Sequence, residues 1–404
     1  MPEFTPQPNR CRIVIRGFGL LTPLGRSAWE TFAALLAGRT LADRAPALPE
    51  KTDPVALARA VGAVSVAQHS PADPTIELAE RAAREAATAA GVRPANLPAF
   101  LGTSKGAVQA LTVAADAGFA RREIRNPLPV TLGPQGYLTH ALRQRLGLGP
   151  ARHHVAACAS SLTALHAARQ YLLDPRSASD RYALVATAEA ALLPSFVHSY
   201  RRLGVLATPT PDGYRQRPLN ADRQGFMLTE AGGAMLLERV DADQPPAPGE
   251  IELCATGVAS EGYDLMRTGP DMPALEHLAR RLFAGRTIDV LHPHATGTPD
   301  HDPAELAALR RAMDTSASAD GVQLYACKGA IGHGLGAAGL SALILACLCL
   351  QTGKLPPMPW IDQPLPDAPW PIAPAARPCS RTGTHATFAA GFGGHVAGAV
   401  ISRC

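Results

Sequence analysis

The chain of 404 residues has few aromatic side chains, only 5% of the total, and only four lysines among its 38 basic residues. Its 34 acidic side chains leave a formal net charge of +4, and no block of basic residues is interleaved with aromatics. Binding along a phosphate backbone requires such a patch, so nucleic acid is not an expected partner. The 47% hydrophobic content is enough for a large core or two fused half-domains.

The sequence also lacks any C-x-x-C pair, although it contains eight cysteines. Scattered single cysteines indicate neither a disulfide framework nor a zinc ribbon. The first residues, "MPEFTPQPNRCRIVIRG", show no apolar segment behind a charged start, so we expect no secretory signal and a cytoplasmic protein. The longest apolar run, residues 337–350, is shorter than the roughly 20 residues that a membrane span needs. It predicts a core helix and no membrane partner.

Short apolar runs alternate with Ala/Leu-rich helical stretches along the chain, as in residues 12–17, 99–104, 182–190 and 287–294. This alternation predicts an α/β fold. The Pro-rich segment "DADQPPAPGE" (241–250) separates two sets of such units. Each set opens with an apolar strand that runs into a glycine-containing turn, which indicates a duplicated unit. We therefore expect two halves, residues 1–245 and 246–404.

Cys158 lies in "VAACASSLTALHAARQYLL" (155–173), between small apolar residues and a predicted helix. Leucine and alanine recur at helical spacing from residue 162 to residue 172, so the helix begins close to the thiol. The unpaired N–H groups of a helix N-terminus favour a thiolate, which makes Cys158 a candidate nucleophile with a lowered pKa. The alternative is a buried cysteine that acts only as a small apolar side chain.

His294 follows an apolar strand in "LHPHATGTPDHDPAELAALRRAM" (291–313). Catalytic groups in α/β proteins gather where strands end. The same stretch offers His292, His301 and Asp302 as possible metal ligands beside His294, although we expect no metal. Asp302 and Glu305 have the spacing of an N-cap and a capping-box glutamate of the following helix.

Lys328 and His333 lie in "YACKGAIGHGLGAAGLSALILACLCL" (325–350). Because lysine is rare in this sequence, Lys328 directly after an apolar strand indicates a site that holds and pairs a compact ammonium group. The alternative is an ordinary surface lysine with an exposed ammonium group. His333 lies in a glycine-rich turn, either facing a cleft or in a structural role. The segment "GLGAAG" (334–339) matches a dinucleotide fingerprint without the acidic residue expected about 20 residues later. A nicotinamide-dependent oxidoreductase is the alternative function.

Taken together and in this order, these stretches resemble the β-ketoacyl-acyl-carrier-protein synthases, the condensing enzymes of the thiolase-like fold. The resemblance begins at "RIVIRGFGLLTPLGRSAWETFAALLAGRT" (12–40) and continues through the Cys158 stretch, "RPLNADRQGFMLTEAGGAMLLE" (217–238) and the two histidine stretches to "GFGG" (391–394). Residues 41–135 match poorly. The resemblance implies a layered αβαβα fold of two duplicated halves, each with a mixed five-stranded sheet.

The resemblance also implies a role for each residue of the motifs. Cys158 would accept the acyl group, and His294 and His333 would flank the malonyl thioester. Lys328 and Glu305 would form a supporting charged pair. Thr296 and Thr298 would contact the phosphopantetheine arm, and Phe392 would be a gate that supplies an oxyanion N–H. The reaction, decarboxylative condensation with malonyl-acyl carrier protein, needs no metal or redox cofactor.

The expected partners are an acidic acyl carrier protein and a second copy of the chain or a related subunit. Arginines at 121, 122 and 125 and at 201 and 202 are candidate docking patches. The complete Cys-His-His set argues against the family's inactive subunits. A non-catalytic acyl-binding subunit is nevertheless the second alternative function. Departures at Ala156, Ala295 and His395 suggest a specialised polyketide or polyene enzyme rather than the housekeeping fatty-acid synthase.

Overall fold

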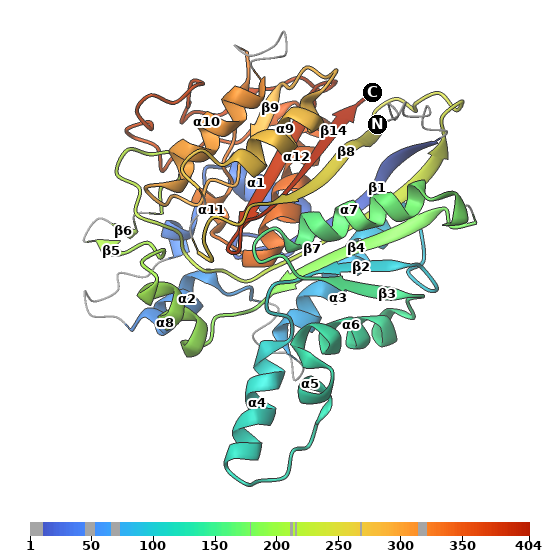
Figure 1. Cartoon of the computed structure of the whole chain (residues 1–404), viewed down its shortest axis with the longest axis vertical. Coiled ribbons are helices and arrows are strands. Elements are labelled where there is room, and N and C mark those ends of the chain that lie inside the picture. The colour runs from blue at the N-terminus through green and yellow to red at the C-terminus, as the bar shows by residue number, and fades with distance from the viewer. Residues whose placement is uncertain are drawn as a thin grey trace.

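The computed structural model describes residues 11–44, 53–65, 73–177, 179–210, 213–214, 216–266, 269–313 and 321–404. Its main sheet has ten strands, five from each half of the chain (Figure 1). The N-terminal strands, in sheet order, are β1 (Cys11–Leu21), β7 (Ala231–Asp241), β4 (Tyr182–Glu189), β2 (Ala99–Gly102) and β3 (Ala151–His154). The C-terminal strands are β8 (Ile251–Ser260), β14 (His395–Arg403), β13 (Thr384–Gly391), β9 (Val290–His292) and β10 (Gln323–Leu324).

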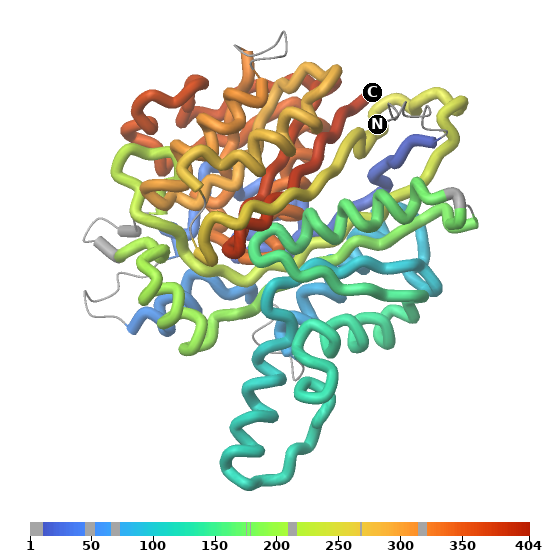
Figure 2. Tube along the Cα trace, in the orientation of Figure 1, coloured from blue at the N-terminus to red at the C-terminus, as the bar shows by residue number. Residues whose placement is uncertain are grey.

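The two sets of five strands have the same pairing pattern, which confirms the predicted duplication. In each set the first three strands are antiparallel and the last three are parallel. Among the strands described, the sets meet only where β1 pairs with β8, at Val14 with Glu252 and Ile15 with Ile251. Figure 2 shows the chain passing once from the N-terminal to the C-terminal set, between β7 and β8. We propose residue 245 as the boundary between the halves.

Two helices lie between the halves. α7 (Ser160–Leu173) and α12 (Ala338–Thr352) contact each other, and each also contacts strands of both sets. The Ser161 hydroxyl accepts a hydrogen bond from the Leu340 N–H at 3.0 Å across this contact. The segment Leu335–Thr352 is long and apolar enough to span a bilayer, but 89% of it is buried inside the protein. It is the predicted core helix, apolar on all sides because both halves cover it.

Outer helices complete the αβαβα layers. α3 (Pro74–Ala90) packs on β1, β7 and β4. α9 (Pro273–Phe283) covers β8 and β14 and packs on α10 (His301–Met313). The remaining elements are α1 (Ala28–Leu36), α2 (Pro54–Gly62), α6 (Gly133–Leu146), α8 (Pro194–Arg202), α11 (Lys328–Ile331), η1 (Leu41–Arg44), η2 (Pro175–Ser177), η3 (Leu335–Ala337), β5 (Pro209–Thr210), β6 (Gly213–Tyr214), β11 (Lys354–Leu355) and β12 (Arg377–Pro378).

Residues 108–131 form a helical arm that extends away from the layers (Figure 1). It contains α4 (Val108–Phe119) and α5 (Leu128–Thr131). Large apolar side chains on the arm face solvent: Val113 is 64% exposed, Phe119 89% and Val130 54%. A second apolar surface is needed to cover such side chains, so the arm is a candidate contact surface.

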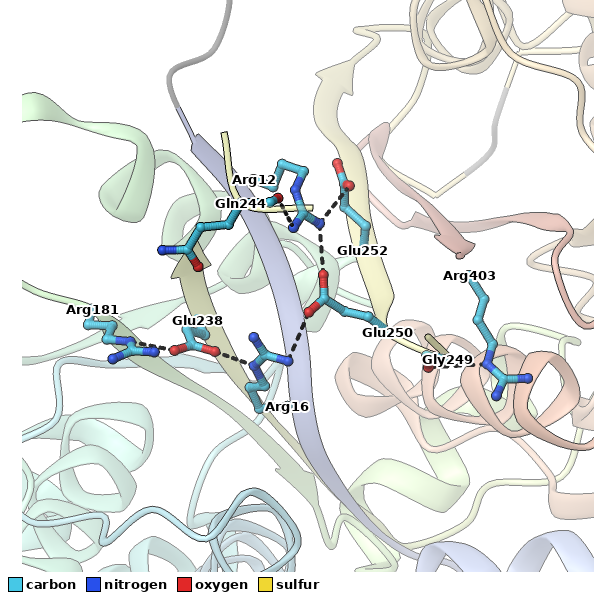
Figure 3. Close-up of polar contacts among 9 residues, drawn as sticks. All are labelled: Arg12, Arg16, Arg181, Glu238, Gln244, Gly249, Glu250, Glu252 and Arg403. Carbon is cyan, nitrogen blue, oxygen red and sulfur yellow. Dashed lines mark hydrogen bonds and ion pairs between the residues drawn. The ribbon is translucent and has the colours of Figure 1, made fainter. Parts of the chain in front are cut away.

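An ion-pair network crosses the junction of the halves (Figure 3). Glu238 on β7, only 2% exposed, pairs with Arg16 on β1 and with Arg181. Glu250, just before β8, pairs with Arg16 at 3.0 Å and with Arg12 at 2.7 Å. The network therefore ties β7, β1 and β8 together where the backbone pairing of the halves is short.

Candidate functional site

Cys158 lies in the turn between β3 and α7. The residue before it, Ala157, has a left-handed backbone with φ of 46°. Gly391 lies against this turn, because a Cβ atom there would come within 2.8 Å of the Cys158 nitrogen. Only glycine fits that position, so the "GFGG" loop reaches the nucleophile candidate through backbone contact alone.

His294 follows β9, and its ring is held by Lys328. The Lys328 ammonium lies 3.3 Å from His294 Nδ1 and also donates to the His294 carbonyl oxygen. Burial and the positive charge of Lys328 hold the pKa of His294 well below its ordinary value, so the ring is neutral. With Nδ1 accepting from the ammonium, the ring proton lies on Nε2.

The carboxylates of α10 fix the loop that carries His294. Glu305 accepts hydrogen bonds from the backbone N–H groups of His294 and Ala295, at 2.5 and 2.7 Å. Asp302 accepts from Gly297 at 3.0 Å and from Leu219 at 2.9 Å. The capping interpretation of these two acids is therefore wrong in its details, because both carboxylates bind loop N–H groups instead of the first turn of their own helix.

Lys328 and Glu305, the predicted supporting charged pair, each contact a different partner. The contact partner of Lys328 is His294, while Glu305 Oε2 lies 3.5 Å from His301 Nε2. The two charges still influence each other, since Glu305 acts to raise the pKa of Lys328. Lys328 is 4% exposed, so it is not a surface lysine.

His333 lies in the turn after α11. Its backbone N–H donates to the Met227 carbonyl at 2.8 Å, and its ring packs edge-on against Phe226 with centroids 4.7 Å apart. The His294 and His333 rings are 5.3 Å apart in the same edge-to-face geometry. Burial and Lys328 hold the pKa of His333 well below its ordinary value, so this ring is neutral too.

Cys158, His294 and His333 meet at one point, with one ligand atom of each within 4.8 Å of the others. They line a cavity of about 780 Å³. Thr296 and Thr298 line the same cavity, and their hydroxyl oxygens are 3.0 Å apart. Phe392 also lines it, and its ring stacks on Tyr200. The structure thus brings every residue predicted for the site into one region.

The expected thiolate is not present in the free protein. Burial raises the pKa of Cys158 to about 11, against the opposing charges of Lys328 and Lys105. Cys158 lies before the N-cap Ala159 and is 8% exposed, so the helix terminus does not outweigh the lost hydration. The predicted lowered pKa is therefore wrong. A thiol beside two neutral imidazoles has a base at hand for its proton.

Of the residues considered for a metal, His292 and Asp302 have structural roles, and the turn considered for a nucleotide is closely packed. His292 bonds to His385 at 3.1 Å and Asp302 binds backbone N–H groups, so the four predicted ligands do not form one set. The "GLGAAG" turn is buried and packed: a Cβ on Gly336 would lie 2.5 Å from Glu189 Oε1. A pyrophosphate has no room there. Its glycines permit close packing beneath the nucleophile turn.

Sequence reasoning missed the buried acid Glu189 near the site and considered His301 only as a metal ligand. Glu189, at the end of β4, accepts from Thr103 Oγ1 at 3.2 Å and from the Ser104 N–H. An acid that ends an apolar strand, as in "YALVATAEA", is the signal that indicates it. His301 lines the cavity with Cys158, and nothing in its spacing distinguishes it from an exposed residue at a helix start.

A thiol and two imidazoles thus converge in one cavity from loops of the two duplicated halves of a thiolase-like fold. The chain belongs to the beta-ketoacyl synthase family: residues 10–242 match the model "Beta-ketoacyl synthase, N-terminal domain" and residues 252–361 the model "Beta-ketoacyl synthase, C-terminal domain". The family resemblance and the fold predicted from it are confirmed.

Similar proteins include synthases of more than one pathway. The chain is 27% identical to the tetracenomycin polyketide synthase ketoacyl synthase alpha subunit of Streptomyces glaucescens, over 97% of each chain. It is 29% identical to 3-oxoacyl-[acyl-carrier-protein] synthase 2 of Mycobacterium leprae, over 64% of this chain and 62% of that one. With erythronolide synthase of Saccharopolyspora erythraea it shares 31% identity, over 56% of this chain and only 7% of that protein.

Solved structures share the fold. A type II polyketide synthase acyl-carrier protein in complex with its ketosynthase contains a chain that matches with a TM-score of 0.80 and 19% identity, over 98% of this chain and 100% of that one. The ishigamide ketosynthase/chain length factor matches with a TM-score of 0.78 and 22% identity, over 98% of this chain and 100% of that one.

Proposed function

We propose that this protein is an active ketosynthase that joins an acyl group held on Cys158 to a malonyl unit held on an acyl carrier protein. The observation that carries the proposal is the convergence of Cys158, His294 and His333 in one cavity. A subunit without catalysis has no need of a complete set of thiol and imidazoles at the base of a cavity.

The first step is transfer of the acyl group. The neutral His333 imidazole takes the Cys158 proton as the sulfur attacks the carrier thioester, because His294 already carries its proton on Nε2, and the proton then passes from His333 to the departing carrier thiol. The products are an acyl-Cys158 thioester and a free carrier thiol. Backbone N–H groups of Cys158 and Phe392 stabilise the oxyanion, each donor contributing about 2.7–4 kcal/mol.

The second step is loss of the malonyl carboxylate as carbon dioxide, which leaves an enolate on the carrier. The neutral His294 and His333 rings donate N–H bonds to its oxygen, and the His294 donor is Nε2, since Nδ1 faces Lys328. The enolate carbon then attacks the acyl thioester, the Cys158 sulfur leaves and regains a proton, and a β-ketoacyl carrier is released.

Intact mass spectrometry tests the proposal. After incubation with an acyl carrier thioester, we expect an acyl adduct on the parent and on Cys404→Ala, and none on Cys158→Ala. Cys404 is exposed, so it controls for accidental acylation of an accessible thiol. Binding of the carrier with no adduct on the parent would instead identify a non-catalytic acyl-binding subunit.

We propose further that the pathway is polyketide or polyene assembly, because Ala156, Ala295 and His395 depart from the housekeeping pattern. The full-length similarity to a tetracenomycin synthase subunit favours this choice. Comparison of turnover on polyene or polyketide carriers and on saturated acyl carriers tests it. Equal or faster turnover of the saturated carriers would contradict it.

We propose Arg201 and Arg202 as the docking patch for the acidic carrier. Both are exposed at the end of α8, next to Tyr200 and Leu203 of the cavity wall. Arg121 and Arg122 lie on the distant arm and serve as a matched control. Charge reversal at Arg201 and Arg202 should slow carrier association and flatten its salt dependence, whereas reversal at Arg121 and Arg122 should change neither. Identical kinetics for both double variants would remove the assignment.

We propose that the protein is a cytoplasmic homodimer. β3 is an edge strand of the ten-stranded sheet, and the arm of residues 108–131 exposes apolar side chains. An unpaired edge and an uncovered apolar arm both favour pairing with another chain.

A further inference from the structure

His301 is a third imidazole in the cavity, and the condensation steps above do not use it. It begins α10, and its side chain is 12% exposed. Its ring lies edge-on to the His294 ring with centroids 5.4 Å apart, while Nε2 lies 3.5 Å from Glu305 Oε2. His301 therefore touches both the catalytic ring and the carboxylate that fixes its loop.

The charges around His301 favour its protonated form. Burial opposes the charged ring, but the Glu305 and Asp302 carboxylates on the same helix outweigh burial and raise the pKa of His301. Lys328, from α11, acts in the opposite direction, and the neighbouring His294 and His333 rings are neutral. Burial alone would raise the pKa of Glu305. His301 and the backbone N–H groups favour the charged carboxylate more strongly, so the pKa of Glu305 is lowered.

We propose that His301 is a positioning residue for His294: its imidazolium holds Glu305 against the His294 main chain, and its charge adds to the burial and the Lys328 charge that disfavour a proton on the His294 ring. The inference rests on the proposed function, since a neutral His294 is needed as the Nε2–H donor to the enolate. Lys328 fixes the ring from one side and the pair of His301 with Glu305 fixes the backbone from the other.

The effect depends on pH with a definite sign. Because the pKa of His301 is raised, the ion pair is complete below that pKa and is lost as pH rises through it. Decarboxylation by the parent should therefore decline above this pKa. Acylation of Cys158 at neutral pH should depend less on His301, because it does not require the enolate donor.

The test compares His301→Gln, which removes the charge, with His301→Lys, which keeps a cation. His277→Gln, an exposed histidine on α9, is the control. At neutral pH we expect His301→Gln to retain Cys158 acylation but to slow decarboxylation about 10- to 100-fold, the range seen for residues that orient a metal-bound histidine from behind. His301→Lys should recover most of the rate and move the alkaline decline to higher pH. A parent-like profile for His301→Gln, or equal losses in both variants, would overturn the proposal.

A second measurement does not depend on turnover. In histidine NMR titrations, the His294 resonance should titrate at a higher pH in His301→Gln than in the parent, because a nearby positive charge has been removed. An unchanged His294 titration would overturn the proposal. If the parent forms no acyl adduct, the proposed function has failed, and the NMR result still decides whether His301 controls His294.

Discussion

At the scale of single residues, the site combines a protonated thiol with two neutral imidazoles. Cys158 has a raised pKa, and burial lowers the pKa of both His294 and His333. The sequence identified all three residues, because Cys158 and His294 follow apolar runs, His333 lies in a glycine-rich turn, and the three motifs together resemble one family. It could not predict their ionisation, since helix proximity was visible in the sequence and the depth of burial was not.

The first prediction concerns the Cys158 thiol. We expect the rate of its alkylation by iodoacetamide, measured by peptide mass spectrometry from neutral to strongly alkaline pH, to rise with a midpoint at pH about 11. Desolvation of the thiolate is the reason. Cys404, which is exposed, is an internal control that shows the reagent is active throughout. A midpoint for Cys158 near neutral pH would show that a thiolate is preformed.

The second prediction concerns the backbone contact at Gly391. In Gly391→Ala the new methyl group would lie 2.8 Å from the Cys158 nitrogen and 2.9 Å from the Ala157 Cβ, so the nucleophile turn must shift. We expect a loss of Cys158 acylation of about 100-fold, the cost of a displacement near 1 Å. Gly262→Ala, whose methyl group meets nothing within 4 Å, should acylate like the parent. Equal acylation rates in the two variants would contradict the contact.

At the scale of elements, the strands and helices were largely predictable and the junction between the halves was not. Alternating apolar and helical runs indicated β1, β4 and α12, because periodicity depends on local sequence. The ion pairs of Arg16 with Glu238 and Glu250 join residues more than 200 positions apart, and no local pattern reports them.

The third prediction concerns this junction. Glu238→Gln should reduce the free energy of unfolding by about 1–2 kcal/mol, less than a fully buried pair costs, because Arg181 is partly solvated. Burial would raise the pKa of Glu238, but its pairs with Arg16 and Arg181 lower it. The stabilisation is therefore present at neutral pH and is lost as pH falls into the acidic range.

Urea unfolding at neutral and acidic pH measures this difference. The parent and Glu238→Gln should converge in stability as pH falls. Asp174→Asn, which breaks a pair with the highly exposed Arg176, is the control and should leave the midpoint nearly unchanged. A loss in Glu238→Gln no larger than in the control would mean that the network contributes nothing to stability.

At the scale of the whole molecule, the arm of residues 108–131 is the feature that the sequence predicted least. It falls in the region that matched the family poorly, and its helices pack little against the layers, so their apolar residues show no clear buried face. The cavity, by contrast, follows from the duplicated halves, which bring Cys158 from one and both histidines from the other to the same place.

The fourth prediction concerns assembly. Light scattering should give a mass twice the 42.2 kDa of one chain, and Phe119→Asp on the arm should shift the protein toward monomer. Leu265→Asp is a matched control, because Leu265 is 84% exposed but lies away from the arm. A monomeric parent, or equal dissociation in both variants, would exclude the arm as a self-association surface.

The most direct test of the central claim is time-resolved intact mass spectrometry of the acylated parent mixed with malonyl carrier. Our account predicts that the acyl group on Cys158 disappears as a β-ketoacyl carrier, longer by the two carbons of the decarboxylated malonyl unit, appears in equal amount. An acyl group that stays on Cys158 while malonyl carrier binds unchanged would contradict the claim that the cavity is a condensing site.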